Sequence, residues 1–228
     1  MEVPVGTVEV NRLTLLLQPV SEVSGEVRLE GAEIDRVMQS LRSLRIQLEP
    51  EDGFMTTLTA AMSSTNFVFR DVREGDYVLR FSGLPDDSYV SSIRVGGREL
   101  ADKSIAVRGR LGRMEVILGS DPGQIEGSVI DAHDQPCGGA RVVLIPNEPR
   151  RKRLESYKSV TTDQYGNFQF KGVMPGSYKL FVWESVEDGA WEDPEFLSTY
   201  EALGVPVEAI PETRVTQSVR MIAQTASR

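Results

Sequence analysis

The chain has 228 residues, of which 40% are hydrophobic and 26% are charged, and its formal net charge is −9. This balance is typical of a globular chain that can form one large β domain or two domains of ordinary size, and we favour two. The acidic excess argues against a nucleic-acid partner, because phosphate binding depends on clustered Lys and Arg. The single cysteine excludes an internal disulfide.

Residues 1–20 have neither the basic start nor the long apolar core of an export signal. No stretch of the chain reaches the ~18 apolar residues that a membrane-spanning helix needs. We therefore expect no membrane insertion by this chain.

Alternation of apolar and polar residues predicts β-strands along most of the chain. In NFQFKGV, for example, Phe168 and Phe170 alternate with Gln169 and Lys171. Further strands are predicted at 25–30, 43–49, 56–62, 88–95, 104–108, 112–119, 125–131, 140–145, 157–162 and 215–222. Because short strands recur with frequent turn signals, the predicted fold class is all-β, with two tandem antiparallel Greek-key β-sandwiches of the prealbumin-like or immunoglobulin-like kind.

Two segments depart from the strand pattern. IDRVMQSL at 34–41 has the spacing of a helix face but is short enough to be a loop. DPEFLSTYEALG at 193–204 predicts a short helix inserted before the last strand. There Asp193 is a good N-cap, Pro194 takes the first helical position and Gly204 is a natural stop.

The chain also repeats itself at a distance of about 100 residues, the length of one small domain. NFVFRDVREGDYVLRF at 66–81 matches NFQFKGVMPGSYKLFV at 167–182. The match extends to SGEVRLEG and EGSVIDAH, and to LRIQLEP and ARVVLIP. We interpret this as a tandem duplication, with domains at 22–121 and 122–228. Residues 1–21 are expected to be the last strand of a preceding repeat, so the chain is interpreted as part of a longer array.

The second repeat resembles the carboxypeptidase regulatory-like domain, a transthyretin-like seven-stranded β-sandwich. The residues that carry the resemblance are Gly127, Asp131, Pro136, Gly139, Ala140, Val142, Thr162, Asp163, Gly166, Phe168, Phe170, Pro175, Gly176, Tyr178 and Leu180. The first repeat is a degenerate copy, with Glu74 in the place of Pro175. The resemblance implies a non-catalytic module of exported or cell-envelope bacterial proteins, related in fold to starch-binding and collagen-adhesin B-type domains.

Four loop residues were weighed as metal ligands or catalytic groups. His133 and Cys137 offer two ligands where zinc needs ~3 or 4, and His133 is the only imidazole that could serve as a base. Asp163 and Asn167, with a nearby carbonyl, offer fewer oxygens than the ~6 to 8 of a calcium site. We predict no catalytic residue, no cofactor and no metal, and we interpret these residues as turn formers.

Two charged segments stand out. The basic run from Arg150 to Arg153 is interpreted as the cap of a solvent-exposed loop. Residues 183–212, here called the acidic segment, hold both tryptophans and nine acidic residues but no Lys or Arg. Its candidate ligand or partner surface comprises Trp183, Glu184, Trp191, Glu192, Asp193 and Tyr200.

Exposed aromatic rings beside carboxylates are typical of a sugar-binding surface. The alternative, which we favour, is that the aromatic residues of the acidic segment pack its helix over one sheet while the acids face water.

The sequence thus predicts a non-catalytic spacer and protein-interaction segment, located in the periplasm or at the cell surface by resemblance. Its partners would be other domains of the same or a neighbouring envelope protein. A polysaccharide-binding module remains a second hypothesis and requires Trp183 or Trp191 to be exposed. A third is an accessory domain of a peptidase or outer-membrane transporter.

Overall fold

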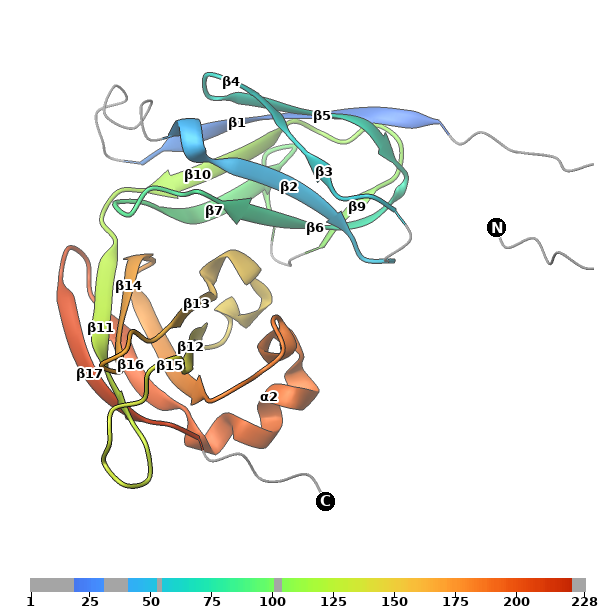
Figure 1. Ribbon diagram of the computed structural model, residues 1–228. Helices are drawn as coiled ribbons and strands as arrows, with labels where there is room; N and C mark the ends of the chain where they lie inside the picture. The colour runs from blue at the N-terminus through green and yellow to red at the C-terminus, as the bar shows by residue number, and fades with distance from the viewer. Residues whose placement is uncertain (1–18, 31–40, 53–54, 101–103, 223–228) are drawn as a thin grey trace, which may run out of the picture.

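Two β-sandwiches follow one another along the chain in the computed structural model, which describes residues 19–30, 41–52, 55–100 and 104–222 (Figure 1). The first domain contains β1 (Val20–Leu29), η1 (Leu41–Ser43), β2 (Arg45–Pro50), β3 (Leu58–Thr59), β4 (Ala61–Ser63), β5 (Asn66–Arg73), β6 (Gly75–Ser82), β7 (Tyr89–Val95), β8 (Arg98–Glu99), β9 (Ser104–Val107) and β10 (Met114–Gly119). The prediction of an all-β fold with two tandem sandwiches is confirmed.

The second domain is built from seven strands, four short 3-10 helices and one α-helix. Its elements are β11 (Gly123–Ile130), β12 (Arg141–Pro146), η2 (Arg150–Lys152), η3 (Leu154–Ser156), β13 (Lys158–Thr161), β14 (Asn167–Val173), β15 (Gly176–Trp183), η4 (Ala190–Glu192), α2 (Pro194–Tyr200), η5 (Glu201–Leu203), β16 (Val205–Ala209) and β17 (Arg214–Arg220). The helix predicted at 193–204 is therefore present as α2 and η5.

Each sandwich packs a sheet that contains its first and last strands against a second sheet. In the first domain the strand orders are β4-β5-β1-β10-β7-β8 and β3-β2-β6-β9. In the second they are β14-β11-β17 and β13-β12-β15-β16. The chain that forms β7 and β8 in the first domain is replaced, in the second, by the helical segment between β15 and β16.

The strand pairing departs from the prediction in one respect. The prediction of antiparallel sandwiches is wrong for one pair in each domain, because β1 pairs with β10, and β11 with β17, in parallel. Each domain begins and ends with strands that run in the same direction, so its two ends lie at opposite ends of the sandwich. Local alternation predicts strands but does not predict which strands become neighbours.

Four predictions concern segments that the structure describes only in part or places differently. Residues 34–40 of the alternative helix or loop at 34–41, and residues 1–18 of the strand expected in residues 1–21, lie outside the described residues. The strand expected at 25–30 begins earlier, at Val20, and the strand expected at 56–62 is divided into β3 and β4. Strands β8 and β16 were not predicted.

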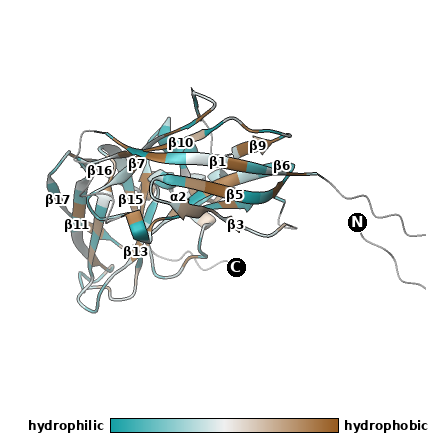
Figure 2. Ribbon diagram, turned by 90° about the horizontal axis from the view of Figure 1, so that it is seen from above, coloured by the Kyte–Doolittle hydropathy of each residue, from teal (hydrophilic) through white to brown (hydrophobic). Residues whose placement is uncertain are grey.

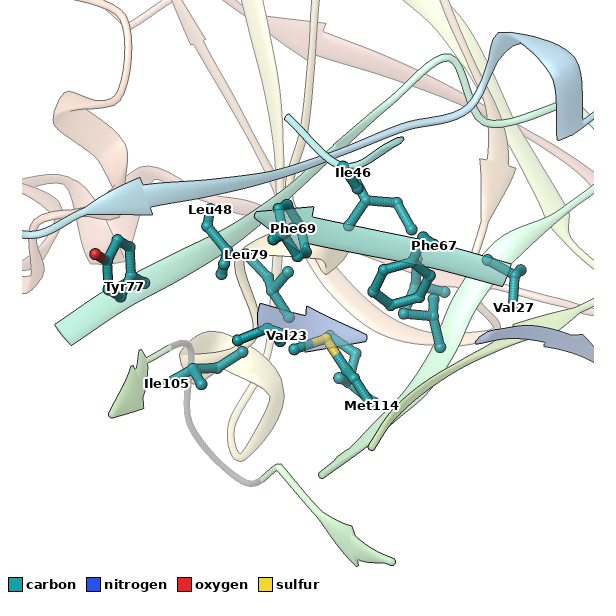
Figure 3. Close-up of a cluster of buried hydrophobic side chains, with 14 of the residues drawn as sticks. Val23, Val27, Ile46, Leu48, Phe67, Phe69, Tyr77, Leu79, Ile105 and Met114 are labelled. Carbon is teal, nitrogen blue, oxygen red and sulfur yellow. The ribbon is translucent and has the colours of Figure 1, made fainter. Parts of the chain in front are cut away.

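Apolar residues at every second position of the strands form the core of each domain. In the first domain, side chains from facing strands meet between the sheets, among them Val23, Ile46, Phe69, Leu79 and Met114 (Figure 3). All five are less than 5% exposed. Hydrophobic and hydrophilic residues are interspersed along β1 and β5 in Figure 2, as expected of strands with one buried face.

The two domains share a close contact on their first strands. Gly25 on β1 lies opposite Phe67, and Gly127 on β11 lies opposite Phe168. A Cβ at Gly25 would collide with the Phe67 ring and would lie 2.6 Å from the Met114 carbonyl oxygen. A Cβ at Gly127 would collide with the Gln217 carbonyl oxygen on β17. Glycine at these positions lets a central strand approach both a phenylalanine ring and its parallel neighbour.

A tyrosine contact is repeated as well. The Tyr77 hydroxyl donates to the Arg73 carbonyl oxygen at 2.9 Å, and the Tyr178 hydroxyl donates to the Met174 carbonyl oxygen at 2.7 Å. Each tyrosine ring is about 1% exposed, so the hydroxyl satisfies a buried turn carbonyl from within the core. Residues that recur in the two sequence repeats therefore make the same contacts in both domains.

We expect Gly127→Ala to destabilise the second domain by about 2 to 3 kcal/mol, because the added methyl group collides with backbone that a side-chain rotation cannot move. Chemical denaturation followed by circular dichroism measures the effect. Ser128→Ala on the same strand is the matched control and should unfold like the wild type. Equal stability of the two variants would show that β11 does not need a close approach at Gly127.

Candidate functional site

The aromatic residues of the acidic segment form a cluster on the outer face of the sheet that contains β12 and β15. Trp183, at the end of β15, is 3% exposed, and Trp191 in η4 is 6% exposed. They pack with residues of both strands, with α2 and with the last described residue: Val143, Ile145, Phe181, Leu197 and Ile222. The interpretation that these aromatic residues hold the helix over a sheet is confirmed.

Trp183 is the centre of this cluster. Its ring stacks on Phe181 at 5.6 Å between centroids and meets the edge of Tyr200 at 5.5 Å. The ring of Phe196 lies 6.0 Å from Trp183 and 5.1 Å from Tyr200, between centroids. Because both indoles are buried, neither tryptophan presents the exposed ring that the polysaccharide hypothesis requires.

The helix is held at both ends by local chemistry. The Asp193 side chain accepts a hydrogen bond from the Glu195 amide at 2.9 Å, and Pro194 occupies the first turn. This satisfies one of the amide groups that a helix leaves without a partner at its start. After Tyr200 the α-helix continues as the 3-10 helix η5, which Gly204 terminates. A Cβ at Gly204 would collide with the Phe181 ring. Asp193 thus acts as a cap rather than as a free surface carboxylate.

Other acids of the segment are paired with bases from distant parts of the chain. Glu192 accepts hydrogen bonds at 2.9 and 3.0 Å from Arg80 of the first domain. Asp188 lies 3.1 Å from Arg141 on β12. Of the other candidate residues, Glu184 is exposed at the end of β15 and Tyr200 is half-buried. The structure therefore gathers Trp183, Trp191 and Tyr200 into one cluster but uses Glu192 and Asp193 for separate structural contacts.

Glu201 is held most firmly of these acids. Arg151 donates to its carboxylate at 2.9 Å and Lys179 does so at 2.6 Å. The hydrogen bond from Arg151, followed by that from Lys179, lowers the pKa of Glu201 to about 2. These contacts join η5 to η2 and to β15.

The interpretation of the basic run as a solvated loop cap is wrong. Arg150 donates to the Pro175 carbonyl oxygen at 2.8 Å and lies over the Tyr178 ring. The side chain of Arg153 is only 14% exposed and reaches the first domain, where it contacts Glu99 and the Ser91 carbonyl oxygen. The partners of these arginines lie far away in sequence, so the charge run alone gave no signal of them.

The loop residues that had been weighed as ligands form turns. Asp163 accepts hydrogen bonds from the amides of Tyr165 and Asn167, and Asp131 accepts them from the amides of His133 and Gln135. The amide of Asn167 is the main cause of the lowered pKa of Asp163. Within the described ranges, no three His, Cys, Asp or Glu residues gather as metal ligands would.

Two adjoining cavities flank Trp191. One, of about 480 Å³, lies between η2 and α2 and is lined by Tyr157, Trp191 and Leu197 with charged residues at its rim. The other, of about 390 Å³, lies between the two domains. Tyr157, Trp191 and Glu192 line both. Sequence reasoning found Trp191 and Glu192 but missed Tyr157, Glu155 and Lys158, which belong to the unremarkable stretch after the basic run.

The comparisons with known proteins bear on the second domain. The model of the carboxypeptidase regulatory-like domain matches residues 124–191, which run from β11 to η4. This match confirms the predicted resemblance of the second repeat to that family. No curated protein sequence matches the chain.

Solved structures similar to the chain include bacterial pilins. The streptococcal ancillary pilin has 12% identity and a TM-score of 0.32, over 88% of this chain and 68% of that one. The minor pilin of Streptococcus agalactiae has 12% identity and a TM-score of 0.32, over 91% and 99%. The major pilin subunit of Bacillus cereus has 9% identity and a TM-score of 0.30, over 89% and 99%. Likeness at this level extends no further than the fold.

We expect Glu201→Gln to destabilise the protein by roughly 1 kcal/mol at neutral pH, since its carboxylate is more than a third exposed and solvent weakens its ion pairs. The folded-state pKa of about 2 lies below the ordinary 4.5, so the ion pairs stabilise the fold above pH 4.5. That stabilisation is lost as the pH falls from 4.5 towards 2. Denaturation curves across this range measure the effect.

The exposed Glu187→Gln is the control for this test and should show no comparable pH-dependent difference from the wild type. A destabilisation of Glu201→Gln that stays constant down to pH 2 would contradict the assignment of the ion pairs as its cause.

Proposed function

We propose that this chain is a non-catalytic, rigid two-domain spacer of an exported or cell-envelope bacterial protein, and that its acidic segment contacts other protein domains. The observation that carries the proposal is the junction between the two sandwiches. Support for the envelope setting comes from the family of residues 124–191. In the described part of the chain, no helix is long and apolar enough to cross a membrane.

The junction is short and is held on several sides. Residues 120–122 alone connect β10 to β11, and the Tyr89 hydroxyl donates to Asp121 within this connection at 2.7 Å. Burial, followed by the hydrogen bond to Asp121, raises the pKa of Tyr89. Gly172 of the second domain lies against the loop before β7, where a Cβ would come within 2.7 Å of the Ser88 carbonyl oxygen.

Three ion pairs cross the interface at separate points. Arg80 contacts Glu192, Arg153 contacts Glu99 at 2.9 Å, and Lys171 contacts Asp86 at 2.8 Å. A single exposed ion pair contributes about 0 to 1 kcal/mol, so none of them would hold the domains alone. Together with the short connection they hold the two domains against each other at several points, which is what a spacer of constant length requires. Exposed acids such as Glu184 remain available to a partner with a basic surface.

The spacer proposal predicts that Arg80→Ala, Arg153→Ala and Lys171→Ala combined loosen the junction without unfolding either domain. Small-angle X-ray scattering should then give a radius of gyration larger by roughly 1 to 2 Å, because compact domains that separate increase it. Arg108→Ala, which breaks an ion pair with Asp76 inside the first domain, is the matched control. Identical scattering from the triple variant and the wild type would reject a junction held by these contacts.

The envelope location has its own test. We expect the natural protein, detected with an antibody in fractionated cells, to be found outside the cytoplasm and to be digested when intact cells or spheroplasts are treated with protease. A cytoplasmic enzyme serves as the lysis control. Recovery of the protein only with that enzyme would refute the location and leave the spacer geometry untouched.

A further inference from the structure

A cavity of about 390 Å³ lies between the two domains and combines walls from both. Leu79, Arg80 and Phe81 of β6 form one side, and Tyr157, Lys158 and Trp191 of the second domain form the other. Glu155 also lines the cavity. Domain interfaces are a common place for small-molecule sites, and this volume falls within the ~300 to 1,000 Å³ of such pockets.

Glu155 is the most unusual group in the cavity. Its side chain is only 7% exposed, and its ion-pair partner, Arg153 Nε, is 3.8 Å away. The Nη atoms of Arg153 are already engaged by Glu99 and by the Ser91 carbonyl oxygen. Burial raises the pKa of the Glu155 carboxyl group. A buried carboxylate without a close cation is unfavourable for folding, and such groups gather at functional sites.

Lys158 places the opposite charge in the same cavity. In the described part of the chain, no carboxylate lies within the 4.0 Å of an ion pair from its amine. The acid whose charge acts on the Lys158 amine is Asp86, which is itself paired with Lys171 at 2.8 Å. Burial lowers the pKa of the Lys158 amine. Glu155 and Lys158, three residues apart in sequence, thus line the cavity without forming an ion pair with each other, whereas the second carboxyl group of the cavity, Glu192, is paired with Arg80.

The other charged residues that line the cavity, Arg80 and Glu192, already have ion-pair partners within the protein. Arg80 is engaged by Glu49 at 2.8 Å and by both oxygens of Glu192. The rest of the wall contains Ser82 and Ser159, and an apolar and aromatic part formed by Leu79, Phe81 and the buried Trp191. A ligand that fits this arrangement has a cationic group for Glu155, an anionic group for Lys158 and an apolar part.

We propose that the interdomain cavity binds a small zwitterion with an apolar side chain, the chemistry of a free aromatic or aliphatic α-amino acid. Its ammonium group would lie against Glu155, its carboxylate against Lys158 and its side chain against the aromatic wall. Binding would add contacts to both domains at once and so strengthen the junction. This activity goes beyond the spacer function and does not depend on the location of the protein.

The test titrates the whole chain with L-phenylalanine and L-leucine by isothermal titration calorimetry, with the emission of the two tryptophans as a second readout. N-acetyl-phenylalanine lacks the ammonium group, phenylalaninamide lacks the carboxylate, and glucose serves as a neutral solute. We expect one saturable site for an amino acid, and binding at least about tenfold weaker for both blocked compounds, since each loses a charge-assisted hydrogen bond.

Glu155→Gln and Lys158→Met are nearly isosteric and should fold, which circular dichroism verifies; each is expected to weaken binding at least about tenfold. Glu208→Gln, an exposed change on β16, should bind as the wild type does. The absence of saturable binding up to about 10 mM amino acid would overturn the proposal. Equal affinity for the free amino acids and the two blocked compounds, or tighter binding of glucose, also overturns the proposal. Neither of these results requires a variant protein.

Discussion

In each domain the first strand carries a glycine that lies against a phenylalanine ring and beside a carbonyl oxygen of the last strand. Because β1 and β11 each lie between two neighbours in their sheets, their spacing decides whether the first and last strands can pair at all. β10 then leads through the short connection at residues 120–122 into β11 (Figure 1). The strand pairs that Gly25 and Gly127 allow therefore lie on either side of the junction between the domains.

The uneven distribution of charge along the sequence is balanced in three dimensions. The acidic segment has no base of its own, yet Arg80, Arg141, Arg151 and Lys179 reach it from both domains. The basic run, in the same way, finds its acids and carbonyl groups on η5 and on the first domain. A local excess of one charge therefore indicates, in this chain, where distant elements are joined. Glu155 and Lys158 are the exception, since burial acts on both and neither is closely paired.

Much of the fold could be predicted because the alternation of apolar and polar residues within strands, and the residues of the turns, are local features. The sequence repeat shows many of these features in both domains. The helical segment was predictable from Asp193, Pro194 and Gly204, which act within a few residues of their positions. Strand β16 was not, because Pro206 interrupts its pattern; the proline is tolerated since β16 is an edge strand. The interdomain cavity could not be predicted, since Tyr157, Lys158 and Leu79 meet only after two domains have docked.

The parallel pairing of first and last strands has a mechanical consequence. A pull on the two ends of a domain would act along β1 and β10, or along β11 and β17, in opposite directions. The hydrogen bonds between Gly25–Leu29 and Met114–Leu118, and between Gln124–Ile130 and Arg214–Arg220, would then be loaded in shear, all together rather than one after another. Such an arrangement resists stretching far better than a hairpin that opens from one end. A chain placed under tension between two anchoring points would keep its length until a whole strand slipped.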